Sequence, residues 1–335
     1  MKRIISLLLA LALSLSLAAC AAPAEKADGG KLQIVTTLFP YYDFARAIAQ
    51  DRADVTLLLS PGREAHSFEP TPLDAVTISE ADVFLYNGGE GEYWVDSMLD
   101  AAGENIAVIA RMMDYVDALD EEYVEGMQGA DGHDHDHEHG SHDDHDHDHE
   151  EDEHDSDEIE YDEHIWTSPK NAVVLCRAVC DAICRADAEN AAFYRANCEN
   201  YCAQLEDLDA RFAALCESAP RRLLIFADRF PMLYFCREYG LDYRAAFHGC
   251  SGDTEPSLAT IKFLIDKVED ENIPVVYTID FGTKKVAAVV SECTGAAIET
   301  LYSMQTVSRA DFDAGETYLT LMERNFEALR KGLNA

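Results

Sequence analysis

The sequence predicts an α/β protein of two halves joined by a long helix, and three observations lead to this prediction. The chain has 335 residues, 48% of them hydrophobic, so it can bury substantial cores. Strand-like and helix-like runs alternate with short connections in two regions, as in parallel sheets covered by helices. A long helical pattern over 188–217 separates these regions. Ligands bind beyond the carboxyl ends of such strands, so two facing sheets would share a cleft.

The first region, 31–187, is the expected amino-terminal half. Short apolar or alternating runs predict strands at 32–36, 55–59, 83–86 and 106–109. Apolar residues at helical spacing predict helices at 41–50, 72–79, 93–101 and 169–185. An acidic insertion separates the last helix from the others.

The second region, 218–335, is the expected carboxyl-terminal half and repeats the alternation. Strands are expected at 223–226, 243–247, 275–279 and 297–301. Helices are expected at 231–239, 256–269, 284–293 and 316–331. Because helices separate the strands, this sheet should also be mostly parallel.

The chain is strongly acidic, with 64 acidic against 26 basic residues and a formal net charge of −38. Nucleic acid is therefore excluded as a partner, because phosphate binding needs a basic face. A cationic ligand fits this charge better.

The first twenty residues have the pattern of an export signal. A positive start is followed by an apolar run and by small residues before Cys20. The sequence LAAC at 17–20 resembles the lipobox of bacterial lipoproteins, in which the cysteine is lipidated. We expect a signal peptide at 1–19, a lipid on Cys20 and a flexible tether over 20–30. The protein would then be exported and anchored in the membrane by this lipid, on the outer side of the cytoplasmic membrane, at the cell surface or in a periplasm.

A stretch rich in histidine and aspartate covers 131–158. It holds nine of the twelve histidines and no apolar residue, so we expect it to be disordered. Imidazole and carboxylate groups bind zinc and similar metals. Ordering a flexible chain costs entropy, so this stretch should be a weak collector of metal ions. Its histidines are His133, His135, His137, His139, His142, His145, His147, His149 and His154.

Three other segments carry candidates for a tighter metal site. PGREAHSFEP at 61–70 contains His66, YDEHIWTSP at 161–169 contains His164, and YTID at 277–280 ends in Asp280. Imidazole and carboxylate are ligands that suit zinc. Glu69 and Asp162 are candidates to hold the histidine tautomers, and the sequence does not rank them.

These segments resemble the motifs of a known family, the zinc- and manganese-specific solute-binding proteins of bacterial ABC importers. PGREAHSFEPTPLD and DEHIWTSP resemble the family's two histidine motifs, and YGL at 239–241 and TEPSLATI at 254–261 resemble its carboxyl-terminal half. A histidine-rich acidic insertion before the second motif marks the ZnuA-like zinc type. The resemblance covers 31–330. It implies two small α/β lobes joined by one long rigid helix at 188–217, with a metal in the cleft between the lobes.

The resemblance also implies four metal ligands, two from each lobe. It assigns His66 and His164 to the first lobe and Asp280 to the second. The family carries His or Glu eleven residues before the glycine of YGL, and here that position is Arg229, which has no lone pair to offer. Asp228, just past the expected strand, and His248, in another loop, both stay open as the fourth ligand, as does water.

The implied function is capture of Zn²⁺ outside the cytoplasmic membrane and delivery to an ABC permease with its ATPase. We expect a monomer with no enzymatic activity. Two histidines and two carboxylates would also accept Mn²⁺, and the histidine-rich stretch favours zinc. Histidine must be neutral to bind metal, so uptake should weaken below about pH 6.5.

Other functions also agree with parts of this sequence. A manganese-specific member of the same family and a surface zinc buffer or adhesin without a transporter both stay open. A zinc hydrolase is disfavoured, because the chain has no HExxH motif, no GxSxG nucleophile elbow and no GxGxxG loop.

Ten cysteines are many for an exported chain. Cys176, Cys180 and Cys184 recur at helical spacing, and Cys198 and Cys202 do so on the next expected helix. If these helices form an antiparallel hairpin, Cys176 faces Cys202 and Cys180 faces Cys198. Two disulfides between the helices and reduced thiols in a helix core both agree with this pattern.

Overall fold

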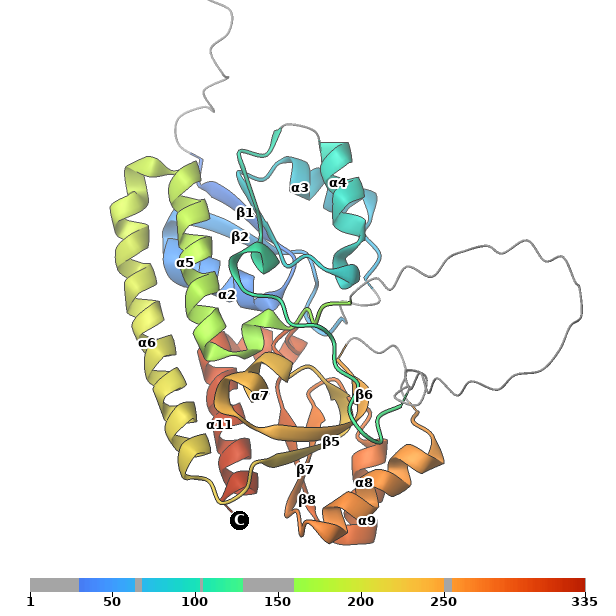
Figure 1. The fold of residues 1–335 in the computed structure, drawn as a ribbon. Helices are drawn as coiled ribbons and strands as arrows, with labels where there is room; N and C mark the ends of the chain where they lie inside the picture. The colour runs from blue at the N-terminus through green and yellow to red at the C-terminus, as the bar shows by residue number, and fades with distance from the viewer. Residues whose placement is uncertain (1–29, 64–67, 103–104, 129–159, 250–254, 335) are drawn as a thin grey trace, which may run out of the picture. The chain divides into compact units, whose positions relative to one another are not determined.

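Two four-stranded parallel sheets form the cores of the two halves, as the sequence predicts (Figure 1). This computed structural model describes residues 30–63, 68–102, 105–128, 160–249 and 255–334. The expected signal peptide, Cys20, His66 and the histidine-rich stretch lie outside the described residues.

The first sheet has the strand order β2-β1-β3-β4. Its strands and their helices are β1 (Leu32–Thr36), α2 (Phe39–Ala49), β2 (Ala53–Leu57), α3 (Pro72–Ser79), β3 (Val83–Tyr86), α4 (Trp94–Ala102) and β4 (Val108–Arg111). The central strands are buried through Ile34, Val83 and Phe84, which are fully shielded from solvent. Helix α3 has the predicted bounds because a capping box of Thr71 and Asp74 starts it.

The second sheet has the order β6-β5-β7-β8, the same arrangement relative to chain order. Its elements are β5 (Leu223–Phe230), α7 (Leu233–Tyr239), β6 (Asp242–His248), α8 (Leu258–Asp270), β7 (Val275–Ile279), α9 (Lys285–Thr294), β8 (Ala297–Leu301), α10 (Arg309–Ala314) and α11 (Tyr318–Leu333). In both sheets the strand order reverses beside the first strand of the half. Parallel sheets bind ligands at the carboxyl ends of the strands at such a reversal.

Strand β5 is longer than predicted. Its pairing with β6 shifts register between Phe226 and Arg229 and then continues to Phe230. The expectation that the strand ends at Phe226 is therefore wrong, and Asp228 lies within the strand at this irregularity. Such irregularities bend a strand and redirect its side chains.

Helices α5 (Pro169–Ala186) and α6 (Ala191–Ser218) pack side by side, and α6 contacts both halves (Figure 1). Near its start, Asn197 donates from Nδ2 to the carbonyl of Ile48 at 2.9 Å. Further along, Asp209 accepts from the Tyr239 hydroxyl at 2.8 Å. Helix α6 is therefore the long connecting helix that the sequence predicts.

The segment from Asp117 to Gln128 was not predicted as a structural feature. It leaves the first half and lies against the second half. The amide of Leu119 donates to the Tyr234 hydroxyl at 3.0 Å, and the amide of Gln128 donates to the carbonyl of Ala246 at 2.9 Å. This segment therefore ties the two halves together on the side of β6.

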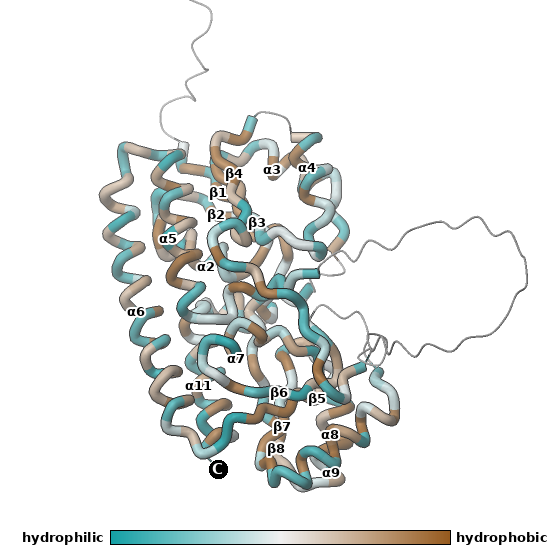
Figure 2. Tube along the Cα trace, viewed as in Figure 1, coloured by the Kyte–Doolittle hydropathy of each residue, from teal (hydrophilic) through white to brown (hydrophobic). Residues whose placement is uncertain are grey.

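Hydrophobic residues are concentrated along strands such as β5, whereas α6 alternates between hydrophobic and hydrophilic residues (Figure 2). This difference follows from burial, because the strands are covered by neighbouring layers and α6 has one face in water. Within the described ranges, no helix is both long and apolar enough to span a membrane.

Candidate metal site

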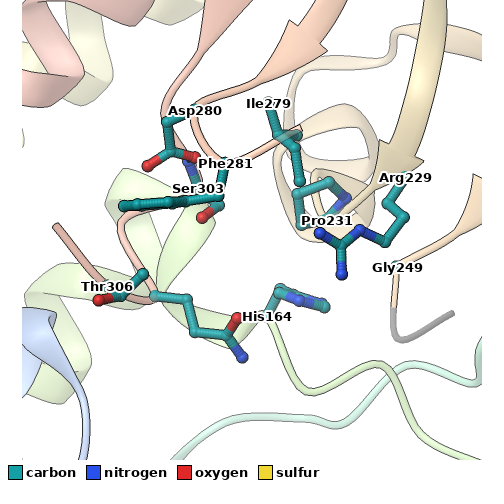
Figure 3. A pocket seen from close by; sticks show the side chains of 10 residues that line it. His164, Arg229, Pro231, Gly249, Ile279, Asp280, Phe281, Ser303 and Thr306 are labelled. Atoms are coloured by element: carbon teal, nitrogen blue, oxygen red, sulfur yellow. The ribbon is translucent and has the colours of Figure 1, made fainter. Parts of the chain in front are cut away.

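A pocket lies at the carboxyl ends of the strands of the second sheet, where a loop of the first half meets them (Figure 3). From the first half comes His164, at the start of the short 3₁₀ helix η7 (Ile165–Thr167). From the second half comes Asp280, directly after β7. The pocket therefore brings together two of the predicted ligands from different halves. Its other lining residues are Arg229, Pro231, Gly249, Ile279, Phe281, Ser303, Gln305 and Thr306.

His164 is held in place by Asp162. Oδ1 of Asp162 lies 3.1 Å from the ring Nδ1 of His164 and also accepts the His164 backbone amide at 2.8 Å. With a proton on Nδ1 directed at this carboxylate, Nε2 carries the lone pair that a metal needs. Gly249 allows close approach, because a Cβ there would lie 3.0 Å from Cε1 of the His164 ring.

The surroundings of His164 favour positive charge. Its burial by itself would lower its pKa, but the charge and hydrogen bond of Asp162 act in the opposite direction. The carboxylates of Glu121 and Glu163 add to that effect, and the net result is a raised pKa. The same negative charges would attract a metal cation in place of the proton.

The Asp280 residue is half-buried, and its carboxylate accepts hydrogen bonds from Ser303. Its Oδ1 accepts the amide of Ser303 at 3.2 Å. Burial, with a further contribution from the charge of Asp228, raises the pKa of Asp280 to about 6. A divalent cation near Asp280 would stabilise the charged form of this carboxyl group.

Asp228 lies close to Asp280 but does not line the pocket. It is 9% exposed, and its Oδ1 accepts the amide of Arg229 at 2.9 Å. Its other oxygen is pressed against Gly282, where a Cβ would lie only 1.7 Å from Oδ2. Glycine at 282 therefore lets the Asp228 carboxylate pack against the turn that follows Asp280.

Arg229 lines the pocket and extends toward His164 (Figure 3). The sequence identified this arginine as unable to bind a metal but gave no sign that its side chain would enter the pocket. Its fixed positive charge lies among the acidic groups of the site. Among the described residues, the possible ligand atoms of His164, Asp228 and Asp280 do not all lie within 4.8 Å of one another.

His248, the alternative fourth ligand, is placed differently. Its Nδ1 lies 3.2 Å from Oε1 of Glu121, and its ring lies 5.0 Å from that of Tyr123. Both partners belong to the segment that crosses from the first half. The neighbouring residue, Gly249, lines the pocket, whereas His248 does not.

The ends of the segment that contains His66 are described even though His66 is not. The amide of Gly62 donates to the carbonyl of Val307 at 2.8 Å, next to the pocket residue Thr306. On the other side, Phe68 is buried against Trp94, with ring centroids 5.1 Å apart. Gly62, four residues before His66, is thus fixed close to the pocket.

Sequence reasoning missed the lining residues that follow β8. Ser303, Gln305 and Thr306 lie just beyond its carboxyl end. The rule that ligands bind beyond strand ends offered a signal for them. They carry no metal-binding motif, so composition and spacing did not single them out.

Comparisons with known proteins agree with this architecture. A family model described as "ZnuA: Zinc-uptake complex component A periplasmic" matches residues 34–332. The high-affinity zinc uptake system protein ZnuA of Bacillus subtilis (strain 168) is 30% identical over 308 residues, or 91% of this chain and 88% of that protein. The zinc-binding lipoprotein AdcA of Streptococcus pneumoniae R6 is 31% identical over 332 residues, which are 99% of this chain but 61% of AdcA.

Solved structures confirm the fold. The metal-dependent lipoprotein YcdH of Bacillus subtilis matches with a TM-score of 0.72 and 29% identity, over 90% of this chain and 100% of that chain. The Zn(II)-bound ZnuA-like domain of Streptococcus pneumoniae AdcA matches with a TM-score of 0.71 and 26% identity, over 91% of this chain and 100% of that chain. An uptake component is a binding protein, in agreement with the expectation that the chain is not an enzyme. The fold and the family model that spans nearly all of it together show that this chain belongs to the ZnuA family of periplasmic zinc-uptake components.

Proposed function

We propose that the chain captures Zn²⁺ outside the cytoplasmic membrane in the pocket between its halves and delivers it to an ABC permease. The observation that carries this proposal is the pocket that joins His164 of the first half to Asp280 of the second. A ligand held by both halves couples metal binding to their relative arrangement, which a permease can recognise. Its ZnuA-family membership supports zinc as the cargo.

The proposed ligands are His66, His164, Asp228 and Asp280. Asp162 orients the ring of His164. The carboxylate of Asp228 lies close enough to Asp280 to raise its pKa. Gly62 is fixed beside the pocket, and four residues of chain can span up to about 14 Å, so His66 lies within reach. Asp228 is favoured over His248 because its carboxylate packs against the turn after Asp280.

Metal binding requires the groups of the pocket to rearrange. The ligand atoms of the described candidates are too widely spaced to enclose one ion, and Arg229 reaches into the same space. We infer that the incoming cation displaces the Arg229 side chain, because two positive charges in one buried site repel each other. Arg229 would thus act as a charge that stabilises the acidic pocket before metal arrives.

The remaining parts of the chain have supporting roles in this proposal. The histidine-rich stretch, 131–158, would collect zinc weakly and raise its local concentration near the pocket. A lipid on Cys20 would keep the protein at the outer surface of the cytoplasmic membrane. The zinc-binding lipoprotein AdcA is a relative whose name contains both features, zinc binding and lipidation.

Uptake of labelled zinc tests the proposal directly. Cells that lack this chain are supplied with the wild type, with His164→Ala or with the matched control His248→Ala. We expect the wild type and His248→Ala to restore uptake and His164→Ala to fail, because only His164 lines the pocket. Equal restoration by all three proteins would contradict the pocket assignment. Restoration of manganese uptake instead of zinc uptake would assign the chain to the manganese type.

The fourth ligand can be tested on the purified protein. Asp228→Asn removes one carboxylate charge and keeps the side-chain size, so we expect zinc affinity to fall by at least tenfold. His248→Asn should leave the affinity within about twofold of the wild type. The reverse pattern would assign the fourth position to His248.

A further inference from the structure

Five cysteines gather between α5 and α6, away from the metal pocket. Cys176, Cys180 and Cys184 lie on successive turns of α5, and Cys198 and Cys202 lie on successive turns of α6. None is more than 7% exposed. Residues four apart lie on the same face of a helix, so each helix presents its thiols to the contact with the other.

The sulfur atoms form a cluster rather than separate pairs. The Sγ atoms of Cys176, Cys198 and Cys202 all lie within 4.8 Å of one another. Along the helices, Sγ of Cys198 lies 3.8 Å from that of Cys202, and Sγ of Cys180 lies 3.9 Å from that of Cys184. Cys198 also interacts with Cys180, so its sulfur has sulfur neighbours on both helices.

These separations suit a metal centre better than a pair of disulfides. Zinc binds thiolate sulfur at about 2.3 Å, and tetrahedral geometry then places the sulfurs about 3.8 Å apart. A disulfide needs two sulfurs at about 2.05 Å and uses each of them once. Here one sulfur approaches three others, which is the arrangement around a common ion.

The charge near the cluster is also favourable. Arg177, the residue after Cys176, pairs with Glu206 of α6 at 3.1 Å, and its positive charge also acts on Cys198 and Cys202. Deprotonated sulfurs around a metal carry a net negative charge, and this arginine would offset part of it. Soft thiolate ligands select ions such as Zn²⁺ and Cu⁺ over hard ions such as Mn²⁺.

We propose that α5 and α6 hold a thiophilic d¹⁰ metal ion, such as Zn²⁺ or Cu⁺, in a buried site formed by Cys176, Cys180, Cys198 and Cys202. Each coordinating thiol releases one proton to water as its sulfur binds the ion, and no electron is transferred. The ion cross-links the hairpin whose second helix contacts both halves. This site shares no residue with the pocket at His164, so either can fail without the other.

Cadmium is a suitable probe, because sulfur-to-cadmium charge transfer absorbs in the ultraviolet and histidine or carboxylate ligands give no such band. The reduced full chain is titrated with cadmium chloride without oxygen. We expect a band that saturates at one thiolate-bound ion per chain. Cys198→Ser should remove most of the band, because this sulfur contacts thiols on both helices. Cys236→Ser, which removes a thiol buried to the same degree in α7, should leave the band unchanged.

Three results would overturn the site. They are the absence of a thiolate band in the wild type, an intact band in Cys198→Ser, and cadmium that neither Zn²⁺ nor Cu⁺ displaces. Displacement of the cadmium by Cu⁺, or by Zn²⁺ in excess, would support a site for a thiophilic d¹⁰ ion. A thiol count on the purified protein, denatured without reductant, tests the redox state. Four fewer thiols than in a reduced sample would replace the proposal with two disulfides between the helices.

Discussion

Glu92 is a buried carboxyl group whose protonation should make the stability of the protein depend on pH. It lies in the 3₁₀ helix η3 (Glu90–Glu92), is 6% exposed, and accepts the amide of Gly88 at 2.8 Å. Burial, with a contribution from the charge of Glu163, raises the pKa of Glu92 to about 7 from 4.5. Because the raised pKa belongs to the folded state, ionisation favours unfolding. Stability is therefore lost as the pH rises from about 4.5 to about 7.

The change Glu92→Gln removes this ionisation and keeps the size and an acceptor oxygen of the side chain. A difference of about 2.5 pKa units corresponds to about 3 kcal/mol of unfolding free energy, since one unit is about 1.4 kcal/mol. At each pH we compare the unfolding free energy of the variant with that of the wild type. We expect this difference to shift by about 3 kcal/mol in favour of the variant from about pH 4.5 to about pH 8, because only the wild type loses stability through this carboxyl. The comparison between two pH values cancels any constant effect of the amide itself.

Urea unfolding of the metal-free protein, followed by circular dichroism at both pH values, measures this difference. Glu90→Gln is the matched control, because Glu90 lies in the same short helix with its side chain exposed to solvent. The control should change the pH dependence of stability much less than Glu92→Gln does, because the Glu90 side chain is exposed to solvent. If Glu92→Gln behaves like the control, the carboxyl of Glu92 is not held in a buried environment that disfavours its charge.

Three further changes test other parts of the molecule. Arg229→Gln removes a positive charge from the pocket, and competition titration should show zinc binding that is about tenfold tighter; weaker binding would mean that the arginine assists the metal. Asp162→Asn weakens the hold on the His164 ring, so the same titration should show zinc affinity lower by about 10- to 100-fold; an unchanged affinity would separate Asp162 from the site. Phe212→Ala removes a fully buried ring of α6 that packs on Phe235, and thermal or urea unfolding should show a loss of about 3–5 kcal/mol; a loss below about 1 kcal/mol would mean that this contact between α6 and the second half is loose.

The regular elements could be predicted because their apolar residues follow simple periods. The expected strands 83–86, 275–279 and 297–301 have the bounds seen in the structure. Each is a short apolar or alternating run between polar residues, and the paired sheets bury such runs. The same applies to helix 72–79, which begins with a proline after a capping threonine.

Features that depend on tertiary contacts could not be predicted. The continuation of β5 past Phe226 runs through Asp228 and Arg229, which interrupt its apolar pattern and are accommodated by the register shift. The segment from Asp117 to Gln128 has no period and is held by partners distant in the sequence, such as Tyr234. Helix α10 is only six residues long, too short for a periodic signal.

In the candidate site, too, the residue types could be predicted from the sequence, whereas their tertiary contacts could not. The residue types and motifs around His164 and Asp280 could be recognised, and the structure places both at one pocket. The sequence could not rank Asp162 above Glu69 as the partner of a histidine. That choice depends on the backbone turn that brings Oδ1 of Asp162 to the backbone nitrogen and to the ring Nδ1 of His164. The direction of the Arg229 side chain likewise depends on the local irregularity of β5.

Competition titration with zinc tests the central proposal, a tight site between the two halves, most directly. It compares the full chain with a chain that lacks 131–158, and it compares each of these with its His66→Ala and His164→Ala variants and with the control His248→Ala. We predict one tightly bound zinc per chain that survives the deletion and the control and is lost in both His66→Ala and His164→Ala. Tight binding that disappears with 131–158 while the pocket variants of the full chain bind normally would contradict the account, and the chain would then be a tethered zinc buffer.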